Sequence, residues 1–168
     1  MAQIVAIGEI LVEIMATRIG QTFLEPGLFA GPYPSGAPAI FADQAARVGA
    51  STALIGCVGP DDFGTLNLNR LAASGVETGG VRRVPGTTTG SAFVTYRADG
   101  GRDFIYNIAN SAAAELDAAQ LTPELFAGCR YFHVMGSSLF SARIAAAVRR
   151  GVELAKAAGA RISFDPNI

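Results

Sequence analysis

A bare loop runs directly into a helix in the stretch Tyr33-Pro34-Ser35-Gly36-Ala37-Pro38-Ala39-Ile40-Phe41-Ala42-Asp43-Gln44-Ala45-Ala46-Arg47-Val48-Gly49, and the other motifs can be arranged around it. Gly36 has no side chain, so a ligand can approach its backbone closely. Pro38 suits the first helical turn, and the free N–H groups of that turn face whatever the loop holds. We interpret the stretch as a binding loop backed by a core helix. An ordinary connection without a ligand is the alternative.

The helix that follows the loop is expected to pack one apolar face against the core. Phe41, Ala45 and Val48 recur at helical spacing and predict that face. Asp43 and Arg47 lie four residues apart and predict an ion pair on another face.

Composition excludes several function classes. The chain has 168 residues, half of them hydrophobic, and a formal net charge of -1, which fits one domain and gives no electrostatic footprint for nucleic acid. The N-terminus has no signal-type charge pattern and no apolar run reaches membrane-spanning length, so a cytoplasmic protein without a membrane partner is predicted. Cys57 and Cys129 are expected to be buried thiols, and His133 a strand histidine, so no metal site is predicted.

The order of elements predicts an α/β fold. Apolar runs at 4–8 and 52–58 are typical of buried parallel strands, and helix signals follow the second run. The alternation breaks at 90–96 and 103–108, where alternating polarity around a Gly-rich turn predicts an antiparallel hairpin. A helix start at Thr122-Pro123-Glu124, a helix over about 141–158 and a strand at 161–165 then resume the α/β pattern. Since a parallel strand needs neighbours, we expect a truncated chain.

Two carboxylates, Glu9 and Glu13, emerge from the apolar segment after the first strand. Carboxylates at the end of a central strand often face a ligand. Whether these two share a face is left open by their spacing.

Six short motifs occur in a recognisable order: Gly8-Glu9 with Glu13, Gly36-Ala37-Pro38-Ala39, Val58-Gly59-Pro60-Asp61-Asp62-Phe63-Gly64, Ser74-Gly75-Val76, Thr89-Gly90 and Phe164-Asp165-Pro166-Asn167. Over essentially its whole length the chain resembles the N-terminal half of PfkB-type (ribokinase-like) carbohydrate kinases. The resemblance implies a Rossmann-like, ribokinase-type sheet with flanking helices and a small β-sheet lid, formed by about 12–34 and 88–109. It also implies phosphorylation of a sugar hydroxyl with ATP and Mg²⁺, by a homodimer joined through the lid.

The resemblance assigns the sugar site to five positions. Glu13 stands where the family has an acidic residue that accepts hydrogen bonds from sugar hydroxyls. Gly36 and Ala37 match the loop that lies against the sugar. Tyr106 and Ile108 match lid positions that cover the sugar and exclude water. For Tyr106, a role in lid packing alone is the alternative.

Three further positions follow from the same motifs. Asn110 follows the lid and is a sixth substrate-binding position, and Asp165 and Asn167 match a motif close to the junction of the sugar and nucleotide sites. Asp165 has an alternative role as the cap of a neighbouring turn.

The departures from the family pattern constrain the substrate. Ser35 and Ile40 replace a glycine and a sugar-binding asparagine of the loop. Ile108 stands where kinases of the acidic sugar 2-keto-3-deoxygluconate often carry an arginine, which would pair with the substrate carboxylate. A neutral sugar such as a ketohexose is therefore favoured, with 2-keto-3-deoxygluconate kinase as an alternative.

The catalytic motif of the family, Gly-Ala-Gly-Asp, does not occur between Met1 and Ile168. No catalytic residue is therefore predicted here, and the base is expected C-terminal of Ile168. A non-catalytic sugar-binding or dimerisation module remains an alternative. A dinucleotide enzyme with Gly36 in a phosphate loop is disfavoured, because no Gly-x-Gly-x-x-Gly follows the first strand.

Overall fold

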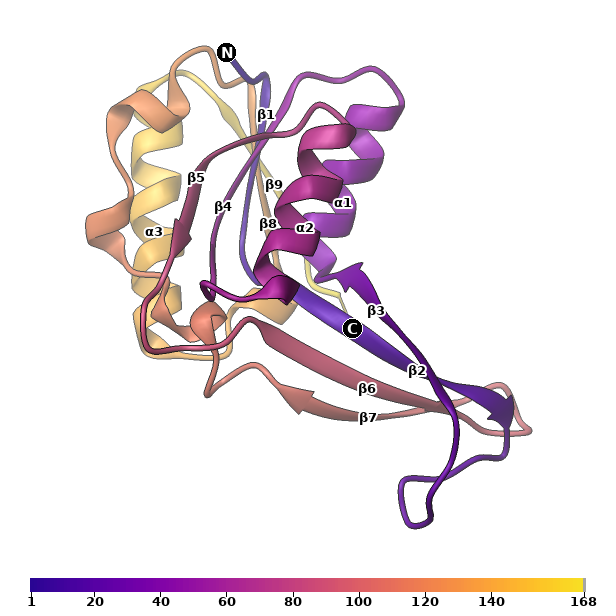
Figure 1. Ribbon diagram of the computed structural model, residues 1–168. Coiled ribbons are helices and arrows are strands. Elements are labelled where there is room, and N and C mark those ends of the chain that lie inside the picture. Colours follow the sequence, from indigo (N-terminus) through magenta and orange to yellow (C-terminus); the bar gives the residue numbers. More distant parts are fainter. Residues whose placement is uncertain (168) are drawn as a thin grey trace.

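The computed structural model describes residues 1–167, which form two β-sheets joined at an angle (Figure 1). The larger sheet is parallel, with strand order β5-β4-β1-β8-β9. Its strands are β1 (Ile4–Ile7), β4 (Thr52–Val58), β5 (Glu77–Arg83), β8 (Tyr131–Met135) and β9 (Arg161–Asp165). The predicted α/β body is thus confirmed, with β1 buried at its centre.

Helices cover both faces of the larger sheet. Figure 1 shows α1 (Ala37–Arg47) and α2 (Asp62–Ala73) on one side and α3 (Ala142–Ala157) on the other. Each side has its own apolar core: Leu54, Val58 and Leu71 are buried on the α1–α2 side, and Phe126 and Phe132 on the α3 side. Short 3₁₀ turns at Ala112–Glu115, Ala118–Gln120 and Pro123–Phe126 fill the chain before β8, and Gly136–Ser138 follows it.

The smaller sheet projects from the body with strand order β3-β2-β6-β7. Its strands are β2 (Leu11–Ile19), β3 (Phe29–Ser35), β6 (Gly90–Tyr96) and β7 (Arg102–Asn107). The hairpin β6–β7 is antiparallel, as the alternating polarity predicts, while the central pair β2–β6 is parallel. Within residues 1–167, no helix has the length and apolarity needed to cross a bilayer.

The buried face of α1 differs in part from the predicted one, since Phe41 does pack against the core. Val48 is exposed, whereas Ala39 and Ala42 are buried against the sheet. Small side chains fit here because they let the helix backbone approach β1 and β4 closely. Asp43 is also buried, although it does form the predicted ion pair with Arg47, at 3.2 Å.

Two further predictions have different outcomes. The helix predicted to start at Thr122 is only the 3₁₀ turn Pro123–Phe126. Phe126 is buried in the core, and Gly128, with a φ of 74°, then turns the chain out of the helical path. His133 is a buried strand histidine, as predicted: Nδ1 lies 3.0 Å from Ser163 Oγ and the ring stacks on Phe41.

Candidate functional site

Strand pairing places Glu13 in one row with two tyrosines on the smaller sheet. Glu13 of β2 pairs with Tyr33 of β3 on one side and with Ala92 of β6 on the other, and Ala92 pairs with Tyr106 of β7. Directly paired residues point to the same face of a sheet. Ala92 is small and buried, so the carboxylate and the phenol face each other across it.

The Glu13 carboxylate and the Tyr106 phenol interact electrostatically. Burial raises the pKa of Tyr106, and the negative charge of Glu13 raises it further, while Arg102 opposes both. The phenol therefore stays protonated at neutral pH and can donate a hydrogen bond. A carboxylate that accepts and a phenol that donates suit a ligand with several hydroxyl groups.

A hydroxyl that the sequence did not single out as a binding group joins this pair. Ser35 Oγ donates to Glu13 Oε2 at 3.3 Å, across the antiparallel pair β2–β3. In the family pattern a glycine stands at Ser35, so the sequence marked this residue only as a departure. The cross-strand register that brings Ser35 close to Glu13 has no local signal in the sequence.

Gly36 is needed where the loop enters α1. Its φ is 104°, and a Cβ atom there would lie 2.5 Å from the carbonyl oxygen of Glu9. The space beside Gly36 is therefore filled by the protein backbone. Pro38 lies in the first turn of the helix, as predicted, and Ala37 is its first residue.

Glu9 and Glu13 do not share a face. Glu9 is buried, and its carboxylate accepts hydrogen bonds from Ser137 Oγ at 2.8 Å and from Ser138 Oγ at 2.5 Å. These bonds tie the carboxyl end of β1 to the turn that follows β8. Glu9 thus has a structural role beneath Gly36, whereas Glu13 is partly open to solvent.

Asp165 and Asn167 lie at the carboxyl end of β9. This end is at the same edge of the parallel sheet as the carboxyl end of β1, which Glu9 follows. Asp165 Oδ1 accepts a hydrogen bond from the backbone N–H of Asn167 at 2.9 Å, and both residues are exposed. The turn cap considered for Asp165 is therefore present. The next strand, β8, ends against this turn, since no Cβ could be added at Gly136 without striking Pro166.

Ile108 and Asn110 follow β7, where the chain returns to the body. Ile108 is half-buried and Asn110 is exposed. Ser111 fixes this return: its hydroxyl donates to the carbonyl oxygen of Ile108 at 2.8 Å and accepts from the N–H of Ala113 at 3.3 Å. Both predicted residues thus lie at the base of the smaller sheet, apart from the row of Glu13 and Tyr106.

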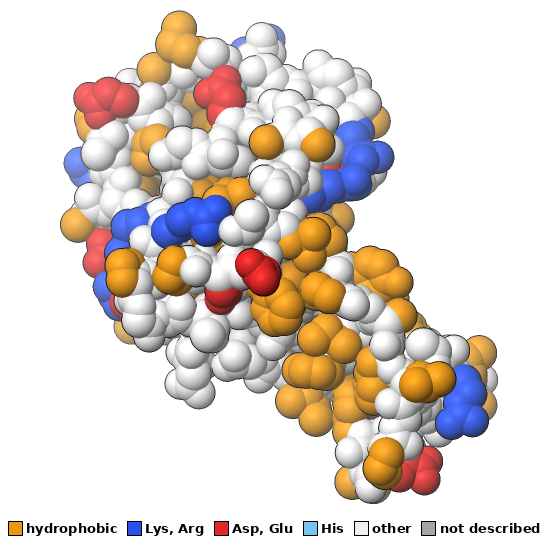
Figure 2. Space-filling model, viewed as in Figure 1, with side chains coloured by type: hydrophobic (Ala, Val, Ile, Leu, Met, Phe, Trp, Pro, Cys, Tyr) orange, Lys and Arg blue, Asp and Glu red, His pale blue; other side chains and the backbone are white. Residues whose placement is uncertain are grey.

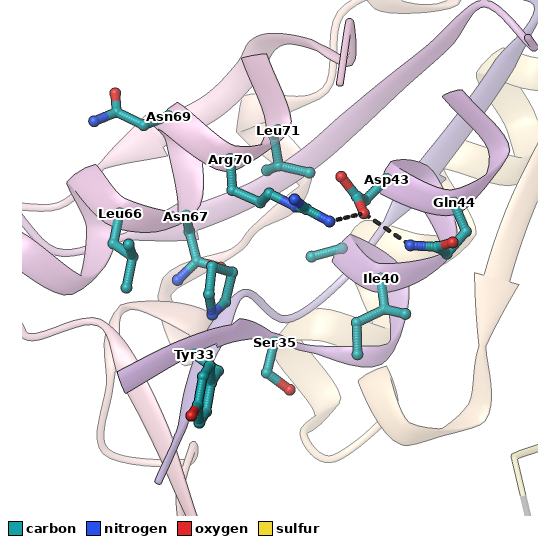
Figure 3. Close-up of a pocket in the computed structure, with 12 residues that line it drawn as sticks. Tyr33, Ser35, Ile40, Asp43, Gln44, Leu66, Asn67, Asn69, Arg70 and Leu71 are labelled. Carbon is teal, nitrogen blue, oxygen red and sulfur yellow. Dashed lines mark hydrogen bonds and ion pairs between the residues drawn. The ribbon is translucent and has the colours of Figure 1, made fainter. Parts of the chain in front are cut away.

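A cavity of about 600 Å³ opens between β3, α1 and α2 (Figure 3). At its back, Asp43 accepts hydrogen bonds from Gln44 and Arg70 at 2.9 and 3.0 Å. The predicted site residues do not line this cavity in the described part of the chain, residues 1–167. The residues that do line it are Tyr33, Pro34, Ser35, Ala39, Ile40, Asp43, Gln44, Leu66, Asn67, Asn69, Arg70 and Leu71. The cavity thus adjoins the row of Glu13 through Tyr33 and Ser35 only.

A parallel α/β body that carries a mixed four-stranded sheet is the fold of ribokinase-like proteins. The chain belongs to the pfkB family of carbohydrate kinases, which it matches over residues 1–168.

Solved structures and curated relatives agree with this membership. A crystal structure of an E. coli protein provisionally called ribokinase II superposes on the whole chain with a TM-score of 0.97 and 53% identity, over 54% of that protein's chain. The same protein has been solved in complex with ATP and Mg²⁺. Fructokinase-1 of Oryza sativa subsp. japonica is 39% identical over 98% of this chain and 51% of its own length. The chain thus spans about half the length of the relatives it matches.

Proposed function

We propose that this chain is the sugar-binding half of an ATP-dependent kinase that phosphorylates a hydroxyl of a neutral sugar, with fructose as the favoured substrate. The observation that carries the proposal is the row of Glu13 and Tyr106, with Ser35 bonded to the carboxylate. An ionised carboxylate accepts strongly from sugar hydroxyls, and each such bond contributes roughly 1.5–3 kcal/mol.

Two features support a neutral ketohexose over an acidic sugar. The side chain of Ile108 offers no cation to a substrate carboxylate. Fructokinase-1 of Oryza sativa subsp. japonica and fructokinase-2 of Solanum lycopersicum are both matched over 98% of the chain. A solved 2-dehydro-3-deoxygluconokinase from Thermotoga maritima shares only 22% identity and bears on the fold alone.

The smaller sheet would act as the lid over the sugar. Tyr106 and Tyr33 flank Glu13 in the same row and are about half exposed. Closure of such aromatic side chains over the sugar would exclude water from the phosphoryl group during transfer. Gly36 and Ala37 would form the floor beneath the sugar, at the positively polarised end of α1.

ATP would supply the phosphoryl group, and Mg²⁺ would neutralise its charge. Asp165 fits a place near them, because its carboxylate is exposed at the carboxyl edge of the larger sheet and Asn167 is held beside it. The catalytic base would come from sequence beyond Ile168.

A homodimer would form through the smaller sheet. Figure 2 shows hydrophobic side chains over much of this sheet, and Ile19, Leu24, Leu28 and Ile105 are largely exposed. The edge strand β3 carries Pro32 and Pro34, which donate no backbone hydrogen bond, so strand pairing through β3 is disfavoured. Pairing through the other edge strand, β7, or contact between sheet faces would then join the two copies.

The test is a phosphorylation assay on the protein in its natural length, with fructose, ribose and 2-keto-3-deoxygluconate as acceptors. We expect fructose to give the highest kcat/KM, and E13Q to lower it while E153Q on the exposed face of α3 leaves it unchanged. Sugar binding without any phosphoryl transfer would favour the non-catalytic module. Preference for 2-keto-3-deoxygluconate would overturn the proposed substrate.

A further inference from the structure

The cavity between β3, α1 and α2 has the size of a small-molecule site. Its volume of about 600 Å³ lies within the range of roughly 300–1,000 Å³ that is typical of ligand pockets. Glu13 and Tyr106, which carry the proposed sugar site, do not line it in the described part of the chain, residues 1–167. The cavity is therefore a candidate for a second ligand.

One wall of the cavity is apolar. Pro34 of β3 and Leu66 and Leu71 of α2 line it (Figure 3). Leu71 is 2% exposed, whereas Leu66 is only half-buried. Part of the apolar surface of Leu66 thus stays open to a ligand, which would gain free energy by covering it.

The buried amide of Asn67 offers an acceptor to the cavity. Asn67 is 1% exposed, and its Nδ2 donates to Leu11 O at 2.8 Å and to Phe63 O at 3.0 Å. Within residues 1–167, no group donates to its Oδ1, and this atom is not among the fully enclosed polar atoms that lack a partner. The Oδ1 atom therefore reaches open space, and Asn67 lines the cavity. A ligand hydroxyl would satisfy it.

Two guanidinium groups share one carboxylate at the back of the cavity. Arg70 Nη2 and Arg47 Nε lie 3.0 and 3.2 Å from Asp43 Oδ2. Gln44 Nε2 donates to the same oxygen at 2.9 Å, and Ser74 Oγ donates to the other oxygen at 2.5 Å. Both oxygens of Asp43 are thus occupied, and this cluster keeps one positive charge in excess.

Arg70 presents that charge to the cavity. It lines the cavity with 39% of its side chain exposed, and among residues 1–167 only its Nη2 makes a hydrogen bond. The remaining N–H groups of the planar guanidinium can donate to a second carboxylate. Figure 2 shows basic side chains on the body beside the hollow that separates it from the smaller sheet.

We propose that this cavity binds a small organic carboxylate with an apolar body and one hydroxyl group. The carboxylate would pair with Arg70, the hydroxyl would donate to Asn67 Oδ1, and the apolar body would cover Leu66. These three residues lie three or four positions apart, or side by side, on α2 and so can contact one ligand. The site is separate from the sugar site and does not rest on the proposed function.

The experiment is isothermal titration of the protein in its natural length with phenyllactate, without sugar. Phenyllactate has a carboxylate, a hydroxyl and an aromatic ring. Phenyllactamide replaces the carboxylate with a neutral amide, and lactate lacks the ring. We expect saturable binding of phenyllactate below about 10 mM, and affinities at least about 10-fold lower for the other two compounds. No saturable binding of phenyllactate would overturn the proposal.

Two variants locate the probe. R70Q should weaken phenyllactate binding about 10-fold and abolish the preference for the acid over the amide, because the charge that makes this preference is removed. R149Q, on the exposed surface of α3, is its control and should bind like the wild type. A folded R70Q protein that still prefers the acid about 10-fold would overturn the role of Arg70.

The second variant, L66W, fills the open wall and should abolish binding. Its control is T65W, because Thr65 is the exposed neighbour on α2 and does not line the cavity. E13Q should leave phenyllactate affinity unchanged. Equal binding by wild type and L66W, or loss of binding in E13Q, would place the probe elsewhere and overturn the proposal. These titrations decide the cavity even if the protein phosphorylates no sugar.

Discussion

Replacing Glu13 with glutamine is the perturbation that bears most directly on the sugar site. The substitution keeps the length of the side chain and one oxygen acceptor but removes the negative charge. Ser35 Oγ can still donate to the remaining oxygen, so β2 and β3 should keep their pairing. Sugar affinity can therefore change without a change of fold.

The magnitude follows from the number of hydrogen bonds that lose a charged acceptor. A hydrogen bond to a charged group contributes roughly 1.5–3 kcal/mol, against about 1 kcal/mol for a neutral one. Replacement of one charged bond by a neutral one therefore removes about 0.5–2 kcal/mol, which corresponds to about a 2- to 30-fold weaker affinity. Because Glu13 is only partly buried, we expect the lower half of that range.

Isothermal titration of fructose into wild type, E13Q and S35A measures the effect. S35A removes only the 3.3 Å bond to Glu13 and should change the affinity less than about 5-fold. Thermal unfolding of each variant reports whether the fold is retained. Equal fructose affinity in wild type and in folded E13Q would refute the assignment of Glu13.

Three further outcomes can be measured. E13Q should lower the pKa of Tyr106, because the charge of Glu13 is one of the causes that raise it. Ultraviolet titration of the phenolate measures this pKa. An unchanged titration curve would mean that the two groups are not close. G36A should destabilise folding by about 2–4 kcal/mol in urea unfolding, since φ is 104° and the new Cβ meets a carbonyl oxygen; wild-type stability would contradict this. Burial raises the pKa of Asp43, but the hydrogen bonds from Ser74 and Arg70 outweigh it and lower the pKa below 3.8. The ionised Asp43 therefore contributes fully to folding stability above about pH 4, and this contribution is lost as the pH falls further. D43N should cost about 1–3 kcal/mol at pH 7 and flatten the loss of stability in acid; an unchanged acid profile would count against it.

A final expectation concerns residues 1–168 alone. Since they contain no Gly-Ala-Gly-Asp motif, a purified 168-residue polypeptide should show no ATP-dependent sugar phosphorylation in a coupled assay. Turnover at an ordinary enzyme rate would place the catalytic base within this sequence.

Local patterns predicted the elements whose causes are local. The apolar run of β1, the alternation around β6 and β7, and the glycine before α1 each specify their own structure. The strand role of His133 also followed from its apolar neighbours, and the structure confirms it.

Such local patterns could not predict the contacts between residues that lie far apart in the sequence. Asp43 is buried because Arg70 of α2 and Ser74, the C-cap of that helix, bond to it from 27 and 31 residues away. Its position on α1 predicted the ion pair with Arg47 but not its burial. The bonds from Ser137 and Ser138 to Glu9 span 128 and 129 residues. Such contacts depend on strand order and register, which no short stretch of sequence encodes.

The central claim is that Glu13 binds the hydroxyls of a neutral sugar. A crystal structure of the protein in its natural length with fructose tests it most directly. Our account predicts a sugar hydroxyl within about 3 Å of a Glu13 carboxylate oxygen and Tyr106 over the sugar. Fructose bound in the cavity between α1 and α2, with Glu13 exposed to water, would contradict it.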